Sequence, residues 1–365
     1  MILLQKGIYD KCYFLERQPV FSTRVFLQHE TNNIISLVGK HTTLAFCSVA
    51  GIGSYIKTRP RIHRRFTRGR SKPSTLPELQ DIWYYTWSAY PVQDVNSTLK
   101  FVPLIHGVDD ASSPDVQGAI SSLPASSTHL LAFNEPDGTT SSGGSAISPS
   151  DAARAYIDDI VPLRTSSSRS WNISHPSVTG SENGLNWLRE FNEACWEIQP
   201  DSGCPTDFVA LHWYGNFEGL ASWIGTMKEY YTNSSDSGAV DPDNLKFWIT
   251  EMALPQQDED DTVAMMNQSL SYLDSLDYIE SYSWFGAFRK DNDVNGFVGD
   301  NVALFDYDGG LTDAGALYLG GEEAGFEEGM KGSASGLGGG GSGGGLLRAS
   351  LLAVLVAVMT MAVNL

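Results

Sequence analysis

The sequence predicts an α/β fold of the (β/α)8 class, the TIM barrel, and three observations lead to it. Short runs that are too apolar to be half exposed indicate buried parallel strands. Stretches with an apolar stripe at helical spacing lie between most of these runs. The alternation extends over about 240 residues, the usual size of such a barrel. A doubly wound open sheet is the alternative, but the Gly-rich phosphate loop that would favour it does not follow the first strand.

Strand candidates begin directly after Asp81. They are residues 83–87, 101–105, 130–134, 173–178, 207–213, 246–250 and 279–285. One more strand should precede them to complete a barrel, and it is poorly defined in this chain. Either residues 44–52 supply it from a distance, or the true first strand is missing.

Helices are expected over residues 151–163, 186–198, 220–231 and 262–276. The first of them follows Ser148-Pro149-Ser150, which is typical of a helix start. The second places Trp187, Leu188 and Phe191 on one stripe, which indicates an amphipathic helix that covers a sheet.

Two glutamates carry most of the functional signal. Glu135 ends the apolar run 130–134, and Glu251 closes the run 246–250. In a barrel the carboxyl ends of parallel strands open at one face, so both side chains are expected in one cleft. A protonated and an ionised carboxyl group in one cleft are what hydrolysis of a glycosidic bond requires. Two ordinary loop carboxylates are the alternative, and the pair in this order favours a glycosidase.

Other strand-end residues are expected to bind the sugar. Asn134 could hydrogen-bond a hydroxyl beside the reacting carbon, or serve only in a turn before Pro136. His212 could keep the nucleophile ionised, or be structural. Flat aromatic faces suit pyranose stacking, although strand alternation cannot put every ring in the cleft. The aromatic candidates are Trp213, Tyr214, Trp284, Tyr85 and Trp87, with Trp284 and Tyr214 the strongest.

The charge is distributed unevenly along the 365 residues. Residues 1–72 hold 13 Lys and Arg against three Asp and Glu, whereas the remainder holds 11 against 40. The acidic body argues against nucleic acid or anionic lipid as a partner.

Residues 1–72 are interpreted as a basic leader or an unreliable segment, and residues 73–325 as the barrel domain. No paired histidine motif occurs, so neither a metal nor a cofactor is expected.

Several features predict a secreted, surface-anchored protein. Cys195 and Cys204 flank a short turn and could form a disulfide, and four Asn-x-Ser/Thr acceptors begin at Asn96, Asn172, Asn233 and Asn267. A Gly/Ser-rich linker over residues 326–345 precedes an apolar segment over 346–365. This order is typical of a signal for a glycolipid (GPI) anchor, and a short transmembrane helix is the alternative. A monomer at the cell surface is expected.

The body also resembles a known family. The motifs that carry the resemblance are Trp83-Tyr84-Tyr85-Thr86-Trp87, Phe133-Asn134-Glu135-Pro136-Asp137, Leu211-His212-Trp213-Tyr214 and Trp248-Ile249-Thr250-Glu251. With these in order, residues 80–320 resemble the fungal alkali-sensitive-linkage-type glycosyl hydrolase catalytic domain, glycoside hydrolase family 128. The chain departs from the family in its missing first-strand motif and in Thr86, where the family pattern has Asn.

The resemblance implies a (β/α)8 barrel that cleaves β-1,3-glucan of the fungal wall, with Glu135 as acid/base, Glu251 as nucleophile and retained configuration. Internal cleavage of the polysaccharide is expected. Two alternatives stay open. One is a non-catalytic wall-binding or adhesion protein that keeps the aromatic cleft. The other is a related barrel glycosidase or transglycosylase that acts on another β-glucan.

Overall fold

The computed structural model describes residues 82–92, 100–165, 169–290 and 295–331, together with five short strands nearer the N-terminus. Contacts divide the chain into two compact units, Gly51–Met359 and Met1–Ala50 with Thr360–Leu365, and each is described by itself. In the smaller unit β1 (Cys12–Tyr13) pairs with β4 (Phe46–Cys47), and β2 (Val25–Gln28) with β3 (Ile34–Leu37), both antiparallel. The predicted linker after residue 331 and the apolar C-terminal segment lie outside the described residues.

The strands of the larger unit form a ring, as the barrel prediction requires. Its members are β5 (Tyr55–Lys57), β6 (Ile82–Tyr84), β7 (Lys100–Phe101), β8 (His129–Leu130), β9 (Asn172–Ile173), β10 (Phe208–Tyr214), β11 (Lys246–Ala253) and β12 (Ile279–Ser283). One sheet has the order β10-β11-β12-β5-β6-β7, and β8 pairs with β9. The bridges Leu104↔Leu131 and Ser174↔Phe208 join the two sheets at both ends. The (β/α)8 fold is therefore confirmed, and each of the seven predicted strands is present in part.

The first strand differs from both alternatives that the sequence suggested. Residues 55–57, rather than 44–52, occupy the gap between β12 and β6. This strand runs antiparallel to both of its neighbours, whereas a regular barrel has all strands parallel. Tyr55-Ile56-Lys57 is a β-prone segment too short to show an alternating pattern, so no hydrophobic periodicity marks it as a strand.

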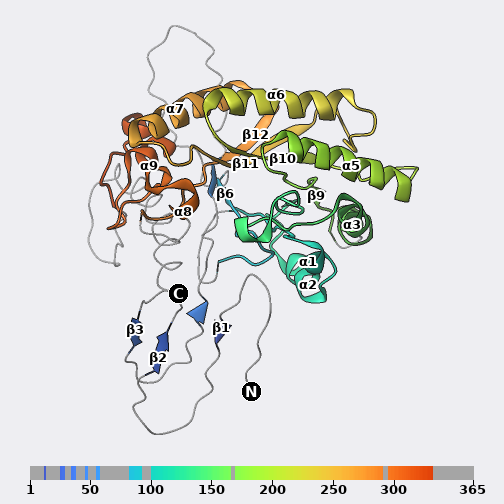
Figure 1. Ribbon diagram of the computed structural model, residues 1–365, viewed down its shortest axis with the longest axis horizontal. Helices are drawn as coiled ribbons and strands as arrows, with labels where there is room; N and C mark the ends of the chain where they lie inside the picture. The colour runs from blue at the N-terminus through green and yellow to red at the C-terminus, as the bar shows by residue number, and fades with distance from the viewer. Residues whose placement is uncertain are drawn as a thin grey trace. The chain divides into compact units, whose positions relative to one another are not determined.

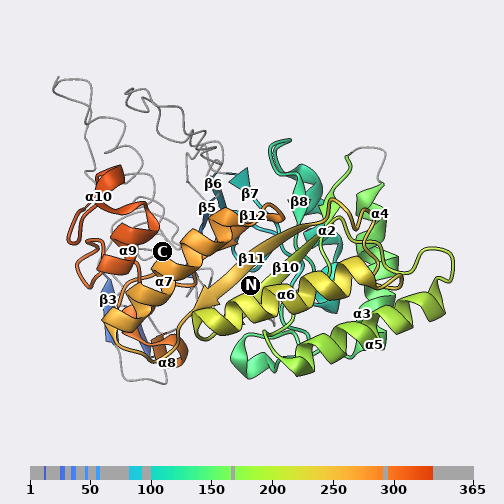
Figure 2. The same cartoon turned by 90° about the horizontal axis from the view of Figure 1, so that it is seen from above.

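Helices cover the outside of the ring, and the long ones match the predicted ranges. They include α1 (Val108–Ala111), α2 (Pro114–Ser122), α3 (Pro149–Ala155) continued by η3 (Tyr156–Ile160) and α4 (Val161–Arg164), α5 (Glu182–Ile198), α6 (Phe217–Asn233), α7 (Glu259–Ser275), α8 (Asn295–Val298), α9 (Asp313–Tyr318) and α10 (Gly321–Ala324), with 3-10 turns η2 (Thr140–Ser142) and η4 (Asp300–Val302). Side chains of Ser181, Asn216 and Asp258 cap the first turns of α5, α6 and α7. These three helices lie side by side over β10, β11 and β12 (Figure 1 and Figure 2).

Two apolar clusters fill the two sides of the strands. The smaller one lies inside the ring and consists of Trp83, Tyr85, Val102, Leu104, Leu131, Phe208, Ala210 and Trp248. Within it the rings of Trp83 and Trp248 meet edge to face, with centroids 4.2 Å apart. The larger cluster lies between strands and helices. The interior is therefore a packed core, so chemistry can take place only at the ends of the strands.

The predicted disulfide between Cys195 and Cys204 is confirmed, and it ties the end of α5 to the chain that leads into β10. Of the predicted glycosylation acceptors, Asn172, Asn233 and Asn267 are exposed, and Asn96 lies outside the described residues. Within the described part of the chain, no helix is both long and apolar enough to cross a membrane.

Candidate active site

The two predicted glutamates meet at the carboxyl ends of their strands. Glu251 lies within β11. Glu135 follows β8, at a point where the parallel bridge Asn134↔Ser177 still pairs this segment with the one that follows β9. His212 of β10 stands between them. Its Nδ1 is 2.9 Å from Oε1 of Glu135 and 3.5 Å from Oε2 of Glu251. A ring nitrogen of His212 and one carboxylate oxygen from each glutamate all lie within 4.8 Å of one another. The two carboxyl groups therefore share one small site.

Glu251 is held on both of its oxygens. The Trp87 indole N–H donates to Oε1 at 2.6 Å, and the Tyr214 hydroxyl donates to Oε2 at 2.6 Å. The Tyr85 hydroxyl lies farther away, 3.4 Å from Oε1, and it also donates to the carbonyl of Thr250 at 2.9 Å. Glu251 is only 4% exposed. Hydrogen bonds to both oxygens fix the plane of the carboxylate, as a nucleophile requires.

Glu135 stands on a backbone in the left-handed region, with φ of 39°. The loop that follows folds back onto it: the N–H of Gly138 donates to the Glu135 carbonyl at 2.9 Å. A side chain at Gly144 would begin 2.6 Å from that carbonyl, so only glycine fits there. Glu135 is half-buried, in contrast to Glu251, and this difference in exposure matches a group that exchanges protons with substrate and water.

Asn134 is anchored by the same loop. Its Nδ2 donates to the Gly143 carbonyl at 3.1 Å, whereas its buried Oδ1 has no hydrogen-bond partner. Asn134 is 4% exposed, so an unpaired acceptor there carries an energetic cost. The unpaired Oδ1 is the atom through which Asn134 could accept a hydrogen bond from a sugar, and that role stays a prediction.

His212 is the electrostatic link between the two carboxyl groups. Burial acts to lower the pKa of this imidazole, but the charges of Glu251 and Glu135 and the hydrogen bond to Glu135 outweigh it and raise the pKa above its ordinary value. Burial and the Glu251 charge raise the pKa of Tyr214 well above its ordinary range, so its hydroxyl remains a donor. His212 can thus offset negative charge between two acids that would otherwise repel each other.

His106 lies beside the site, although it was not among the predicted site residues. It follows the predicted strand 101–105 directly, and its Nε2 lies 3.1 Å from the Gly143 carbonyl that also receives Asn134. Burial lowers the pKa of His106, against the opposing effects of the Gly143 carbonyl and of the Asp110, Glu251 and Glu135 charges. Its position directly after an apolar run, like that of Glu135, is the signal that could have revealed it.

The aromatic predictions are only partly supported. Trp284 does not line the cleft: it is fully buried, and its indole donates to the Val302 carbonyl at 2.8 Å. Tyr85 is also fully buried, beneath Glu251, so it offers no face to a sugar. Trp213 packs against Gly219, and its indole donates to Asn216. Successive side chains of a strand point to opposite faces of the sheet. His212 and Tyr214, on either side of Trp213, face the glutamates. Trp213 therefore points away from them.

The cluster of Glu135, His212 and Glu251 is also the group of described residues best placed to hold a metal ion. However, the imidazole Nδ1 of His212 is directed at Glu135, 2.9 Å from its Oε1. The donors from Trp87 and Tyr214 bind a carboxylate directly and leave its charge stabilised without a metal. The cluster is therefore the candidate catalytic group that the sequence predicted.

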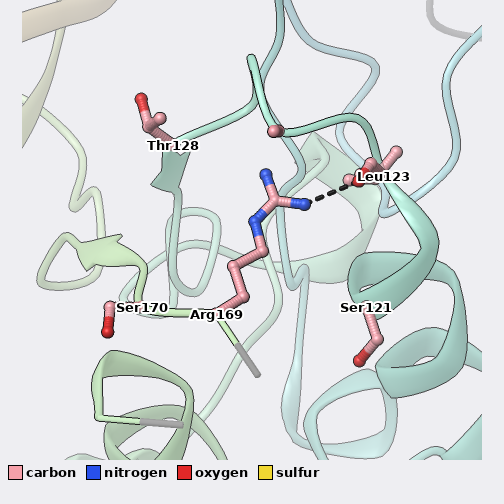
Figure 3. A pocket seen from close by; sticks show the side chains of 6 residues that line it. Ser121, Leu123, Thr128, Arg169 and Ser170 are labelled. Carbon is pink, nitrogen blue, oxygen red and sulfur yellow. Dashed lines mark hydrogen bonds between the residues drawn. The ribbon is translucent and has the colours of Figure 1, made fainter. Parts of the chain in front are cut away.

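A surface pocket lies away from this site, beside Thr128 and Ser170 at the amino ends of β8 and β9 (Figure 3). Arg169 extends into it, but its guanidinium donates to the carbonyls of Leu123 and Pro124 at 2.7 and 2.8 Å. The same group stacks on Trp171 at 3.9 Å. The pocket-lining residues include no carboxylate, so the candidate active site is the opposite end of the barrel.

Comparison with known proteins identifies the family. Residues 72–318 match the family described as the glycosyl hydrolase catalytic core. The chain belongs to the glycosyl hydrolase catalytic core family. The matched range includes both glutamates and all the strands from β6 to β12.

Three relatives of this glycosyl hydrolase illustrate the likeness. Alkali-sensitive linkage protein 1 of Schizosaccharomyces pombe is 31% identical over 244 residues, which are 65% of this chain and 40% of that protein. The chain therefore matches less than half the length of that relative. An exo-β-1,3-glucanase of Aureobasidium namibiae, from family 128, shares the fold, with a TM-score of 0.53, 22% identity and coverage of 65% of this chain and 84% of the other. An endo-β-1,3-glucanase of Lentinula edodes from the same family has a TM-score of 0.50, 27% identity and coverage of 64% and 87%.

Proposed function

We propose that this glycoside hydrolase cleaves β-1,3-glucan internally and with retention of configuration. The arrangement of Glu135, His212 and Glu251 within 4.8 Å of one another is the observation that carries the proposal. Retaining enzymes keep their two carboxyl groups about 5–5.5 Å apart, whereas inverting enzymes need about 6.5–9.5 Å to admit a water molecule. The close pair leaves no room for that water and supports a covalent intermediate.

In the first step an oxygen of Glu251 bonds to the anomeric carbon as the bond from that carbon to the leaving oxygen breaks. Glu135 gives its proton to that leaving oxygen. In the second step water attacks the anomeric carbon and gives a proton to Glu135, while the bond to Glu251 breaks and restores its carboxylate. Trp87 and Tyr214 then stabilise the charge that returns to Glu251.

The choice of β-1,3-glucan is supported by the relatives. The matched structures from Aureobasidium namibiae and Lentinula edodes are both β-1,3-glucanases, one exo-acting and one endo-acting. We favour internal cleavage, as the sequence predicted; the matched structures include both kinds of enzyme, so the product test below decides between them.

The test is to incubate the full chain with linear β-1,3-glucan and to follow product size and anomeric form. We expect a rapid fall in solution viscosity and short products of initial β configuration. Glucose alone from the first minutes would show exo action, and α products would show inversion. Absence of products from a folded protein would favour a binding role or another β-glucan. The full chain is needed because β5 lies upstream of the family match.

We also propose that the protein is secreted and held at the cell surface by a glycolipid anchor. The exposed Asn172, Asn233 and Asn267 acceptors, the disulfide and the apolar C-terminal sequence support this location. A phosphoinositide-specific phospholipase should release the protein from membranes. Recovery of the intact C-terminal segment by mass spectrometry would contradict the proposal.

A further inference from the structure

Phe297 differs from most other large apolar side chains of the described chain because it is 60% exposed. A single exposed apolar residue is ordinary on a protein surface and indicates nothing by itself. The surroundings of Phe297 set it apart. Its ring meets the ring of Tyr214 edge to face, with centroids 5.1 Å apart. The Tyr214 hydroxyl is 2.6 Å from Oε2 of Glu251, so Phe297 stands two side-chain contacts from the nucleophile.

The backbone around Phe297 is fixed by the loop that follows β11. The Gln256 side-chain amide donates to the carbonyls of Gly296 and Phe297 at 3.3 and 3.0 Å. The Gln256 N–H donates to the carbonyl of Val298 at 2.9 Å, and the Val298 side chain is buried. Gln256 makes these bonds from a left-handed backbone, with φ of 57°. Such backbones cost energy and persist where the surrounding structure holds them in place.

Phe297 is thus an exposed aromatic ring near Glu251, on a segment whose backbone is held by hydrogen bonds from Gln256. We propose that Phe297 forms a glucose-stacking subsite next to the catalytic pair, and that Gln256 is its positioning residue. The inference rests on the proposed β-1,3-glucanase function and extends it to one binding contact. A flat apolar face accepts the apolar face of a pyranose ring, and a ring held in place loses little entropy on binding.

The subsite is tested by binding, separately from catalysis. In a Glu251→Gln background, calorimetry with a β-1,3-linked glucose hexasaccharide measures affinity without turnover. Adding Phe297→Ala should weaken binding about tenfold, which corresponds to about 1.4 kcal/mol. Phe297→Leu should weaken binding similarly because the flat face is lost. Phe297→Trp keeps a flat aromatic face and should bind with the affinity of the Glu251→Gln parent. Val240→Ala is the matched control, since Val240 is 47% exposed and pairs with Thr206 before β10 begins, at the amino end of that strand.

The active enzyme gives the second readout. Phe297→Ala and Gln256→Ala should raise KM about tenfold for the hexasaccharide and leave kcat within about twofold, because neither side chain touches the reacting atoms. Hexasaccharide binding that Phe297→Ala leaves unchanged would overturn the subsite alone. Absence of hexasaccharide binding by the Glu251→Gln protein itself would overturn the proposed substrate, and the subsite with it. An equal loss with Val240→Ala would show a general surface effect and would also refute the inference.

Discussion

The substitution Tyr214→Phe isolates one hydrogen bond to Glu251, the proposed nucleophile. The Tyr214 hydroxyl is 2.6 Å from Oε2 of Glu251, and the change removes one oxygen atom from a ring that otherwise stays in place. A hydrogen bond to a charged group contributes about 1.5–3 kcal/mol. The full effect falls on catalysis because charge returns to Glu251 as the glycosyl intermediate breaks down. At about 1.4 kcal/mol per tenfold, kcat should fall by about 10- to 150-fold.

Tyr85→Phe is the matched control, since it makes the same chemical change beside the same carboxylate. The Tyr85 hydroxyl is 3.4 Å from Glu251 and donates to the Thr250 carbonyl at 2.9 Å. Its removal should lower kcat by less than about tenfold, but reduce stability by about 1 kcal/mol because a buried carbonyl loses a donor. The assay is steady-state hydrolysis of β-1,3-glucan together with urea unfolding. Equal losses of kcat in the two variants, or wild-type activity in Tyr214→Phe, would refute the assigned roles.

Three further outcomes are expected. Glu135→Gln and Glu251→Gln should each lower the hydrolysis rate by at least about 10²-fold with an unchanged circular dichroism spectrum, and near wild-type rates in either would remove the assignment. Burial lowers the pKa of His175 from 6.5 to about 4, so its stabilising contribution is present above pH 6.5 and is lost as the pH falls toward 4. Urea unfolding should show about 2 kcal/mol lost from this group between pH 7 and pH 5, and a His175→Asn variant should lack that part of the pH dependence. Reduction of the Cys195–Cys204 disulfide should cost about 2–3 kcal/mol for its short loop, measured as a lower urea midpoint, with a Cys195→Ser and Cys204→Ser double variant as the comparison.

The barrel and the meeting of its two strand-end glutamates could be predicted because they depend on local pattern and one topological rule. Apolar runs mark buried strands, and parallel strands bring their carboxyl ends to one face, so Glu135 and Glu251 had to meet. The position of His212 followed from the same rule. Its contact with both carboxyl groups did not, because that depends on the register shift between β10 and β11 at Leu211 and His212.

Other features depend on packing that no local pattern records. Trp87 and Trp284 both lie near the ends of predicted strands, 83–87 and 279–285, yet Trp284 is buried against Val302 and Trp87 donates to Glu251. The face to which a side chain points at the end of a strand depends on the residue at which the regular in–out alternation of side chains stops. Phe297 lies outside every predicted strand and helix, so its approach to Tyr214 is visible only in three dimensions.

The left-handed backbones described at the active site have a consequence for engineering. In the described chain the non-glycine residues with positive φ are Trp87, Glu135, Ala146 and Gln256. Trp87 donates to Glu251, Glu135 is the proposed acid/base, Ala146 follows the loop that packs on Glu135, and Gln256 holds the backbone of Phe297. Each such residue stores about 1–3 kcal/mol. Replacing these residues by glycine would relieve the strain, so a search for heat-tolerant variants is expected to select such substitutions. The melting temperature would rise, but the side chains of the candidate active site would be lost.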